Sequence, residues 1–386
     1  MGFVVRQRVG SCAIFHLFFA LPSLLVIARW LLPLSLPTWI KVSGAVALLF
    51  VSQYHLWSRF SSGSVFAPEF PRPIVLLFNW AFGAVLLLAV MQIAIDVASL
   101  IGWSIRRGEW AMPDAVRYVA GAAALVLAAI GVATAARVPP VKDVSVTIRD
   151  LPPRFDGYRI LQLTDLHLSR LFTARWATAM VSRANAAGAD TIVVTGDFID
   201  GSVAMRHNDV QPLAGLRAPD GVYAVPGNHE YFFDYAAWMR RIGDLGIRML
   251  PNAHVTLRRG DAALVIAGVT DLSARGAGQA PPDLNAALAG APAGAPVVLL
   301  DHQPRNARVA AERGVALQMS GHTHGGMIVG LAKLLEPANA GFVSGAYQVG
   351  DMTLYVSNGT GLWPGFALRL GRPSEMTRFT LRRAPA

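Results

Sequence analysis

Four long apolar segments in the first 142 residues constrain the fold of this 386-residue chain more than any other feature. They cover residues 12–28, 34–51, 74–101 and 115–135. Each approaches or exceeds the roughly 20 residues that an α-helix needs to cross a bilayer. A cleaved signal peptide is the alternative for the first segment, but it lacks a clean small-x-small cleavage site and three more apolar segments follow it. The sequence therefore predicts a four-helix transmembrane region within residues 1–142.

The net charge of +10 is concentrated in this first part, because residues 1–142 carry +7 and residues 143–386 carry +3. With the N-terminus in the cytoplasm, the inner segments carry seven basic residues and the outer loops five, which slightly favours a multi-pass protein of the cell membrane with residues 143–386 in the cytoplasm. No lysine- or arginine-rich run indicates a nucleic-acid partner. The single cysteine, Cys12, excludes a disulfide framework and a thiolate metal cluster.

From residue 143 onward, short runs of β-branched and aliphatic residues alternate with alanine-rich stretches. The runs predict strands at residues 144–148, 158–163, 191–195, 222–225, 264–269, 297–300 and 316–319, then a hairpin of 341–349 with 352–356 and a closing strand at 376–381. The alanine-rich stretches predict helices at 175–187, 235–245, 283–288 and 305–313. This alternation indicates a layered α/β domain over residues 143–386.

Residues of the types that bind metal ions directly follow five of these predicted strands. They are Asp165 and His167, Asp197, Asn228 and His229, His302, and finally His322 and His324. Sites in α/β folds form at the carboxyl ends of strands, and five of the nine histidines lie in these loops. In the last loop, Gly-His-Thr-His-Gly-Gly, two imidazoles would share one face of an extended chain. The sequence therefore predicts a metal site at this edge of the sheet.

Carboxylate, amide and imidazole ligands without a thiolate suit divalent Mn, Fe or Zn. Seven ligands from this group of eight residues would exceed the needs of one tetrahedral zinc ion, and they are about right for two ions that share a bridging carboxylate. Two ions roughly 3.5–4 Å apart generate hydroxide and stabilise both oxygens of an in-line phosphoryl displacement. The expected cofactor is therefore a pair of divalent metal ions, and the expected chemistry is phosphate-ester hydrolysis.

The blocks D-x-H, G-D, G-N-H-E, H and G-H-T-H-G-G occur in this order and resemble the calcineurin-like metallophosphoesterase superfamily. The resemblance covers residues 144–386 and is strongest to the bacterial membrane-anchored branch of YkuE and YaeI phosphoesterases. The tail typical of that branch is present as Gly361-Leu362-Trp363-Pro364-Gly365-Phe366, Arg369 and Pro373-Ser374-Glu375, whereas Met327 stands where many relatives carry Gln. The resemblance implies a four-layer αββα domain.

The resemblance also implies a role for each site residue. Asp165, His167 and His324 would hold the first metal ion, Asn228, His302 and His322 the second, and Asp197 would bridge both. His229 would not be a ligand but would act beside the substrate as general acid or charge stabiliser. Asp301 has two interpretations, orientation of the neighbouring imidazole or solvation at a strand end. Asp200, His207, His254, Asp271 and Arg305 have no such support and are interpreted as surface or turn residues.

The function implied by this resemblance is hydrolysis of a phosphodiester or monoester by in-line attack of a metal-bridging hydroxide, with a lipid-linked ester as one candidate substrate. The membrane bilayer is the other expected partner. Two alternatives stay open. One is a pyrophosphatase acting on a nucleotide-linked lipid precursor. The other is a non-catalytic membrane scaffold or sensor, although inactive relatives usually lack ligands that are all present in this sequence.

Overall fold

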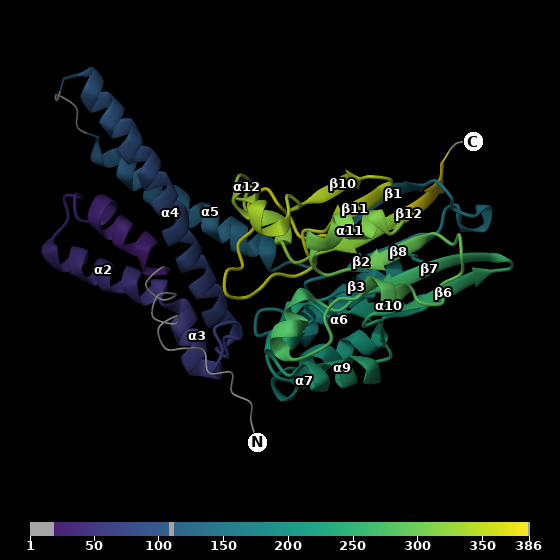
Figure 1. The fold of residues 1–386 in the computed structure, drawn as a ribbon. Coiled ribbons are helices and arrows are strands. Elements are labelled where there is room, and N and C mark those ends of the chain that lie inside the picture. Colours follow the sequence, from purple (N-terminus) through teal and green to yellow (C-terminus); the bar gives the residue numbers. More distant parts are fainter. Residues whose placement is uncertain (1–18, 108–111, 385–386) are drawn as a thin grey trace. The chain divides into compact units, whose positions relative to one another are not determined.

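The computed structural model describes residues 19–107 and 112–384, and its chain forms two compact units (Figure 1). The first unit contains the described residues up to Ala133 together with a short segment of the C-terminal part, Pro364–Leu368. The second unit contains Thr134–Trp363 and the residues from Arg369 onward. Each unit has its own core, and each is described separately below.

The first unit is helical. It begins with an apolar helix at Phe19–Leu31, whose last turn, η1 (Ile27–Leu31), is a π-helix. Four helices follow: α2 (Thr38–Ser52), α3 (Tyr54–Ser62), α4 (Arg72–Ile105) and α5 (Asp114–Ala135). At 1.5 Å per residue, the 34 residues of α4 and the 22 residues of α5 span about 51 Å and about 33 Å. Both lengths exceed the roughly 30 Å hydrocarbon core of a bilayer. By length and composition, α4 and α5 are therefore candidate membrane spans.

The prediction of four membrane spans is not supported, because only these two described helices are long enough. Helix α2 has 15 residues, about 22 Å, and starts only at Thr38 since Pro37 interrupts the predicted segment 34–51. The predicted segment 12–28 lies partly outside the described residues. Its described part belongs to the helix Phe19–Leu31. Two short apolar helices thus stand where two further spans were expected.

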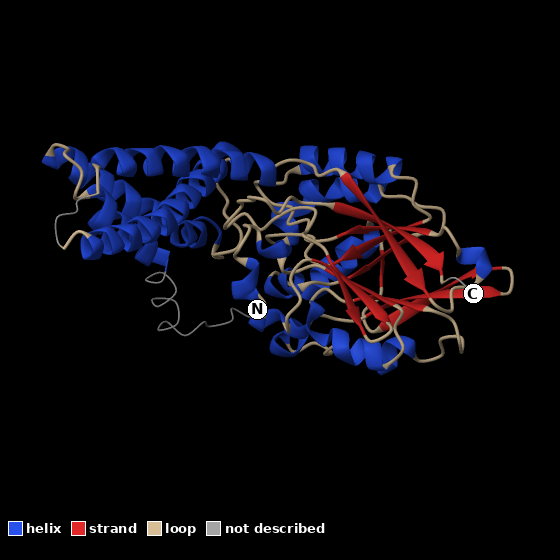
Figure 2. Cartoon of the chain, turned by 90° about the horizontal axis from the view of Figure 1, so that it is seen from above, coloured by secondary structure: helices blue, strands red, loops and turns tan. Residues whose placement is uncertain are grey.

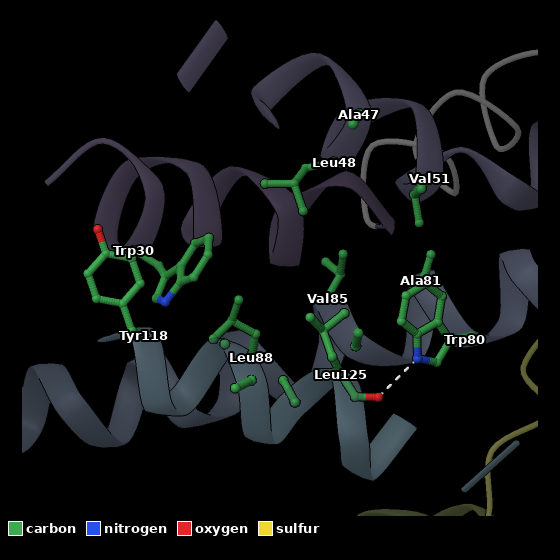
Figure 3. A pocket seen from close by; sticks show the side chains of 14 residues that line it. Trp30, Ala47, Leu48, Val51, Trp80, Ala81, Val85, Leu88, Tyr118 and Leu125 are labelled. Atoms are coloured by element: carbon green, nitrogen blue, oxygen red, sulfur yellow. Dashed lines mark hydrogen bonds between the residues drawn. The ribbon is translucent and has the colours of Figure 1, made fainter. Parts of the chain in front are cut away.

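Helices α2, α4 and α5 line an apolar groove of about 420 Å³ (Figure 3). Two tryptophans border it, and each indole N–H is already bonded to a backbone carbonyl: Trp30 Nε1 donates to Arg117 at 2.7 Å and Trp80 Nε1 donates to Leu125 at 2.9 Å. The walls of the groove are therefore almost entirely hydrocarbon, as expected for a surface that contacts other apolar groups and not water.

The second unit contains two six-stranded sheets (Figure 1). The first sheet has the order β1 (Val141–Ile148), β12 (Met376–Arg383), β2 (Arg159–Leu163), β3 (Thr191–Thr195), β4 (Val222–Val225) and β5 (Arg248–Met249). The second has the order β10 (Gly345–Val349), β11 (Met352–Val356), β9 (Leu317–Ser320), β8 (Val297–Leu300), β7 (Ala262–Gly268) and β6 (Ala253–Arg259). Strands β2 to β5 are parallel, and so are β7, β8, β9 and β11.

The two sheets pack face to face, because one buried cluster contains Ile160 and Val193 of the first sheet with Ile266 and Leu300 of the second. Successive residues of a strand point to opposite faces. Val265 and other alternate residues of the second sheet accordingly contact the helices on its outer side, α10 (Leu284–Leu288) and α11 (Ala307–Glu312).

Helices α6 (Ala174–Ala186), α7 (Val203–Val210) and α9 (Tyr235–Asp244) belong to the first sheet's half of the unit, and helices lie on both sides of the strands (Figure 2). Strand β1 lies at the edge of its sheet, and the predicted α/β domain is confirmed. Strands β5 and β6 are additions to the prediction.

Candidate metal centre

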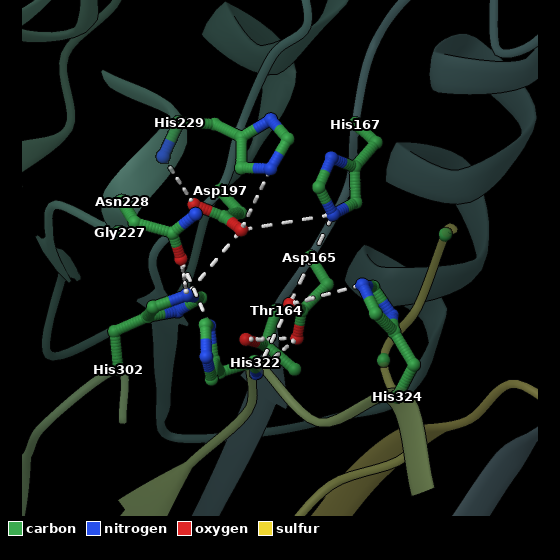
Figure 4. Close-up of polar contacts among 12 residues, drawn as sticks. Thr164, Asp165, His167, Asp197, Gly227, Asn228, His229, His302, His322 and His324 are labelled. Atoms are coloured by element: carbon green, nitrogen blue, oxygen red, sulfur yellow. Dashed lines mark hydrogen bonds and ion pairs between the residues drawn. The ribbon is translucent and has the colours of Figure 1, made fainter. Parts of the chain in front are cut away.

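The predicted ligands lie together where strands of both sheets end (Figure 4). The loops that carry them follow β2, β3 and β4 of the first sheet and β8 and β9 of the second. The group comprises Asp165, His167, Asp197, Asn228, His302, His322 and His324. Because these strands are parallel within each sheet, their carboxyl ends meet at one edge, and residues more than 150 positions apart become neighbours.

Asp197 lies at the centre of this group. Its Oδ2 atom is 3.7 Å from His167 Nε2 and 3.3 Å from His302 Nε2. On one side of Asp197, the Oδ1 atom of Asp165 lies 4.0 Å from His167 Nε2 and 3.8 Å from His324 Nε2. Asp197 thus occupies the place between two clusters of donor atoms.

The second cluster contains an amide. Asn228 Oδ1 is 3.0 Å from His302 Nε2 and 2.9 Å from His322 Nδ1. The donor atoms of Asp165, His167 and His324 lie within 4.8 Å of one another, and so do those of Asp197, His302 and His322. The donor atoms of His167, Asp197 and His229 form a third such group. The first two groups contain residues that the resemblance assigns to the two ions, with Asn228 beside the second, and the third includes the histidine that the resemblance excludes from the ligands.

The chemistry of the donor atoms fits metal ions. His167 Nε2 is buried, has no hydrogen-bond partner among the described residues, and faces the carboxylates of Asp165 and Asp197. A buried nitrogen left unpaired is costly, and a metal ion would satisfy it. Burial and the nearby charge of His302 lower the pKa of His322 to about 3, so that this imidazole is neutral and offers a lone pair. Burial alone would raise the pKa of Asp197, but His302 and His229 outweigh it and hold that pKa well below its usual range.

The backbone at most of these positions is unusual. Five of the seven predicted ligands have positive φ: Asp165 (54°), His167 (45°), Asp197 (53°), His322 (70°) and His324 (50°). Non-glycine residues adopt this left-handed conformation rarely, and it clusters at functional sites. The His-x-His turn was predicted to be extended, with both imidazoles on one face. This prediction is wrong, because His322 and His324 both have positive φ. His322 points to Asn228, while His324 points to Asp165.

Two glycines make room for the carboxylates. A Cβ atom on Gly227 would lie 2.8 Å from Asp197 Cγ, and one on Gly321 would collide with the Asp165 carboxylate and the Thr164 side chain. Both glycines therefore allow the loops from β4 and β9 to approach the acidic side chains as closely as they do.

The interpretation of Asp200 as a surface or turn residue is wrong. Its side chain is fully buried and joins two histidines, with Oδ2 3.1 Å from His167 Nδ1 and Oδ1 2.5 Å from His229 Nδ1. Asp200 thereby orients both rings. Burial favours neutral His229, but Asp197 and Asp200 outweigh this and raise the pKa of His229 to about 9. Its place three residues after Asp197, in the same strand-end loop, does not distinguish Asp200 from other loop aspartates in the sequence.

Glu230 is a second buried acidic residue of the site that the sequence pattern does not predict. Its carboxylate accepts hydrogen bonds from the backbone N–H groups of Asp197, Phe198 and Gly227 at 2.7–3.1 Å. It therefore ties the loop after β3 to the loop after β4, and so fixes the position of Asp197.

Asp301 does not orient its neighbour His302 in the way that one interpretation proposed. His302 Nδ1 lies 2.7 Å from the carbonyl oxygen of Thr195, which holds this ring. The Asp301 carboxyl is buried, which raises its pKa to about 8 with the help of nearby Asp271, so the strand-end solvation interpretation fails as well.

The remaining residues interpreted as surface or turn positions have different outcomes. His207 and Arg305 are exposed, as expected. His254 is half-buried, with Nδ1 2.8 Å from the carbonyl oxygen of Ala287. Asp271 is a turn residue, since it accepts a hydrogen bond from Ser273 N–H, but it is buried rather than on the surface.

Comparison with known proteins agrees with this geometry. A family model for the calcineurin-like phosphoesterases matches residues 158–326. The uncharacterized metallophosphoesterase YkuE of Bacillus subtilis is 32% identical over 240 residues, which cover 60% of this chain and 82% of that protein. The chain belongs to the calcineurin-like phosphoesterase family. Members of this family are metal-dependent hydrolases that act on phosphate esters.

Vertebrate relatives link this phosphoesterase domain to membrane helices. Proteins named transmembrane protein with metallophosphoesterase domain from Danio rerio and Bos taurus are 33% and 36% identical over 271 and 278 residues, respectively. Each match covers 67% of this chain and 61% of the relative, so the chain spans less than two thirds of their length. Together with α4 and α5, these names support membrane association of the phosphoesterase.

Proposed function

We propose that this calcineurin-like phosphoesterase hydrolyses a phosphate monoester or diester at a membrane with the help of two divalent metal ions, Mn, Fe or Zn. The observation that carries the proposal is the position of Asp197, whose Oδ2 atom lies between His167 Nε2 at 3.7 Å and His302 Nε2 at 3.3 Å. A carboxylate between two ligand clusters suits a bridge between two ions. Asp165, His167 and His324 would complete one ligand set, and Asn228, His302 and His322 the other.

Metal ions at these ligands would supply charge neutralisation of the phosphate and a lower pKa of water. The residues of the chain supply position and protons. Glu230 and the turn glycines fix the carboxylates, and Thr195 fixes the His302 ring. Asp200 holds Nδ1 of His229, and the raised pKa of His229 keeps a proton available for the leaving oxygen at Nε2.

A lipid-linked phosphate ester is the proposed substrate class. The support is the membrane-length helices α4 and α5 in the same chain and the names of the vertebrate relatives, which describe transmembrane proteins. Helices that keep the enzyme in a bilayer also keep it near phosphates carried by lipids.

We expect the full-length protein in detergent to contain close to two divalent ions per chain and to hydrolyse phosphate esters only when those ions are present. Elemental analysis measures the first quantity. An activity panel of mono-, di- and pyrophosphate esters, run with and without excess chelator, measures the second. Full hydrolysis in excess chelator contradicts the proposal. Preference for the pyrophosphate ester favours a pyrophosphatase, and metal binding without any hydrolysis favours a scaffold.

We also propose that the phosphoesterase domain lies in the cytoplasm. The chain flanking α4 and α5 on the domain's side carries Arg59, Arg72, Arg137, Lys142 and Arg149, while the connection between the two helices carries Arg106 and Arg107. Cytoplasmic segments are enriched in basic residues. A reporter that works only in the cytoplasm, fused after Ala386, is therefore expected to be active, and activity of a periplasmic or extracellular reporter there instead overturns the orientation.

A further inference from the structure

The loop after β11, residues 357–361, contains no predicted ligand but lies beside two of them. Strand β11 pairs in parallel with β9, so this β11 loop leaves the second sheet next to the turn that carries His324. The N–H of Gly361 in the loop donates to the carbonyl oxygen of Asp165 at 2.9 Å. The β11 loop is therefore bonded to the backbone of one predicted ligand and follows a strand next to the other.

Gly359 brings the β11 loop close to both ligands. A Cβ atom added to Gly359 would lie 3.0 Å from His324 Nδ1 and 3.2 Å from Asp165 Cβ. The φ of 87° at Gly359 belongs to the left-handed region, which glycine adopts without a steric cost. Asp165 and His324 thus share one neighbouring segment of backbone, which passes them at a distance that favours glycine.

Arg369 binds the β11 loop and the His324 turn at the same time. Its Nη2 atom donates to the carbonyl oxygens of Asn358 at 2.5 Å and Gly361 at 3.1 Å. Its Nη1 atom donates to the carbonyl oxygens of His324 at 3.1 Å and Arg372 at 3.0 Å. A planar guanidinium holds several acceptors in fixed directions. One side chain of the second unit therefore joins three segments of that unit's backbone.

The guanidinium of Arg369 is a buried charge, since this residue is only 1% exposed. Burial lowers the pKa of Arg369 to about 10, although Asp165 and Glu375 oppose the change, so the group stays charged at neutral pH. A buried charge often stabilises a fold no better than a hydrophobic side chain of similar volume. The contribution of Arg369 that a hydrophobic side chain could not supply is therefore the fixed position of the carbonyl groups that it binds.

We propose that Arg369 is a positioning residue for one of the two metal ions. Its guanidinium fixes the backbone of His324 directly and the backbone of Asp165 through Gly361, and both ligands belong to the set that includes His167. Among the described residues, its hydrogen bonds reach no member of the other set, Asn228, His302 and His322. This inference rests on the proposed function, in which these residues bind two ions.

The test replaces Arg369 by lysine, which keeps a positive charge but cannot hold carbonyl groups in the directions of a planar guanidinium. Arg369→Met removes the charge as well and fills part of the same space. The matched control is Arg378→Lys, because Arg378 of β12 also donates to a backbone carbonyl oxygen, that of Ala187, and pairs with Asp143. All variants are studied as full-length protein in detergent.

The first readout is hydrogen–deuterium exchange without added metal, which is independent of activity. Peptides that carry Met327 and Gly361 report on the positioning, because these N–H groups donate to the carbonyl oxygens of the two ligands. We expect both Arg369 variants to speed exchange in these peptides by about tenfold, since hydrogen bonds that fix both segments are lost. Arg378→Lys is expected to leave this exchange unchanged.

The second readout is Mn²⁺ titration followed by electron paramagnetic resonance. We expect both Arg369 variants to bind one ion with the affinity of the parent and the other about tenfold more weakly. Their spectra should therefore show isolated Mn²⁺ ions at concentrations that give a coupled pair in the parent. A role confined to the stability of the domain would weaken the binding of both ions equally.

The inference is overturned by parent-like exchange in both Arg369 variants, by equal weakening of both ions, or by the same changes in Arg378→Lys. Failure of both Arg369 variants to fold also overturns it, because Arg369 would then support the whole domain. A parent protein that binds no Mn²⁺ or hydrolyses no ester contradicts the proposed function instead. In that case the exchange measurement alone decides whether Arg369 positions the His324 turn and the β11 loop.

Discussion

Replacing Asp197 by alanine is expected to empty the metal centre and to abolish phosphate-ester hydrolysis. The Asp197 carboxylate is the only predicted ligand near histidines of both clusters, and its Oδ1 atom also accepts the N–H of His229 at 2.9 Å. Loss of groups that merely orient metal ligands costs roughly 10–100-fold, so loss of a shared ligand is expected to cost more than about 10²-fold in metal affinity and activity. Elemental analysis and initial rates measure the two effects.

The control for this change is Asp261→Ala. Asp261 is an acidic residue of the same domain with a 96% exposed side chain, 3.6 Å from Arg154. The control variant is expected to retain two ions and the parent rate. A parent-like metal content in Asp197→Ala would show that the two clusters bind ions without a shared carboxylate.

Replacing His229 by alanine is expected to leave the metal content close to that of the parent while kcat falls by about 10²–10⁴-fold, the contribution of a general acid. His229 Nδ1 is held by Asp200, and Nε2 lies 3.9 Å from Asp197 Oδ2. The ring also forms a group of possible ligands with His167 and Asp197, so metal content has to be measured beside kcat to separate a catalytic role from a ligand role. The pKa of about 9 means that the ring carries its second proton at neutral pH.

Leaving groups separate this role from metal binding. A nitrophenyl ester releases an anion that needs no proton, whereas the leaving group of an alkyl ester needs one. The fall in kcat of His229→Ala should therefore be smaller for the nitrophenyl ester than for the alkyl ester. His207→Ala provides the control, since His207 is exposed on α7 and is expected to tolerate the change. The general-acid role is refuted by equal losses for both substrates, and a lost metal ion places His229 among the ligands.

Much of the second unit could be predicted because its strands are buried apolar runs. Strands β3, β4 and β8 occur at the predicted positions, and every residue of β3 is buried. Once parallel strands are placed, the loops after them must meet, so the gathering of the histidines followed from the sequence. The helical conformation of Asn228 and His229, which lie in the first turn of α8 (Asn228–Phe232), did not follow from the sequence, because no helix was predicted at these residues.

Other parts depend on contacts that no short stretch of sequence contains. Strand β6 carries polar residues at most positions and is a strand because it pairs antiparallel with β7 across Gly260 and Asp261. That glycine, at φ 67°, was the available hairpin signal. Asp200 resembles any loop aspartate until the fold brings His167 and His229 to its two oxygens.

The left-handed backbone at five of the predicted ligands has a consequence for the stability of the domain. At Asp165, Asp197 or His324, glycine would adopt the observed φ without steric conflict, whereas Asp and His hold it at a cost on the order of 1 kcal/mol each. The five positions together therefore cost on the order of 5 kcal/mol of folding free energy. The buried strands and the hydrogen bonds around the loops must offset this cost, so the domain gives up part of its stability to hold these imidazoles and carboxylates in place.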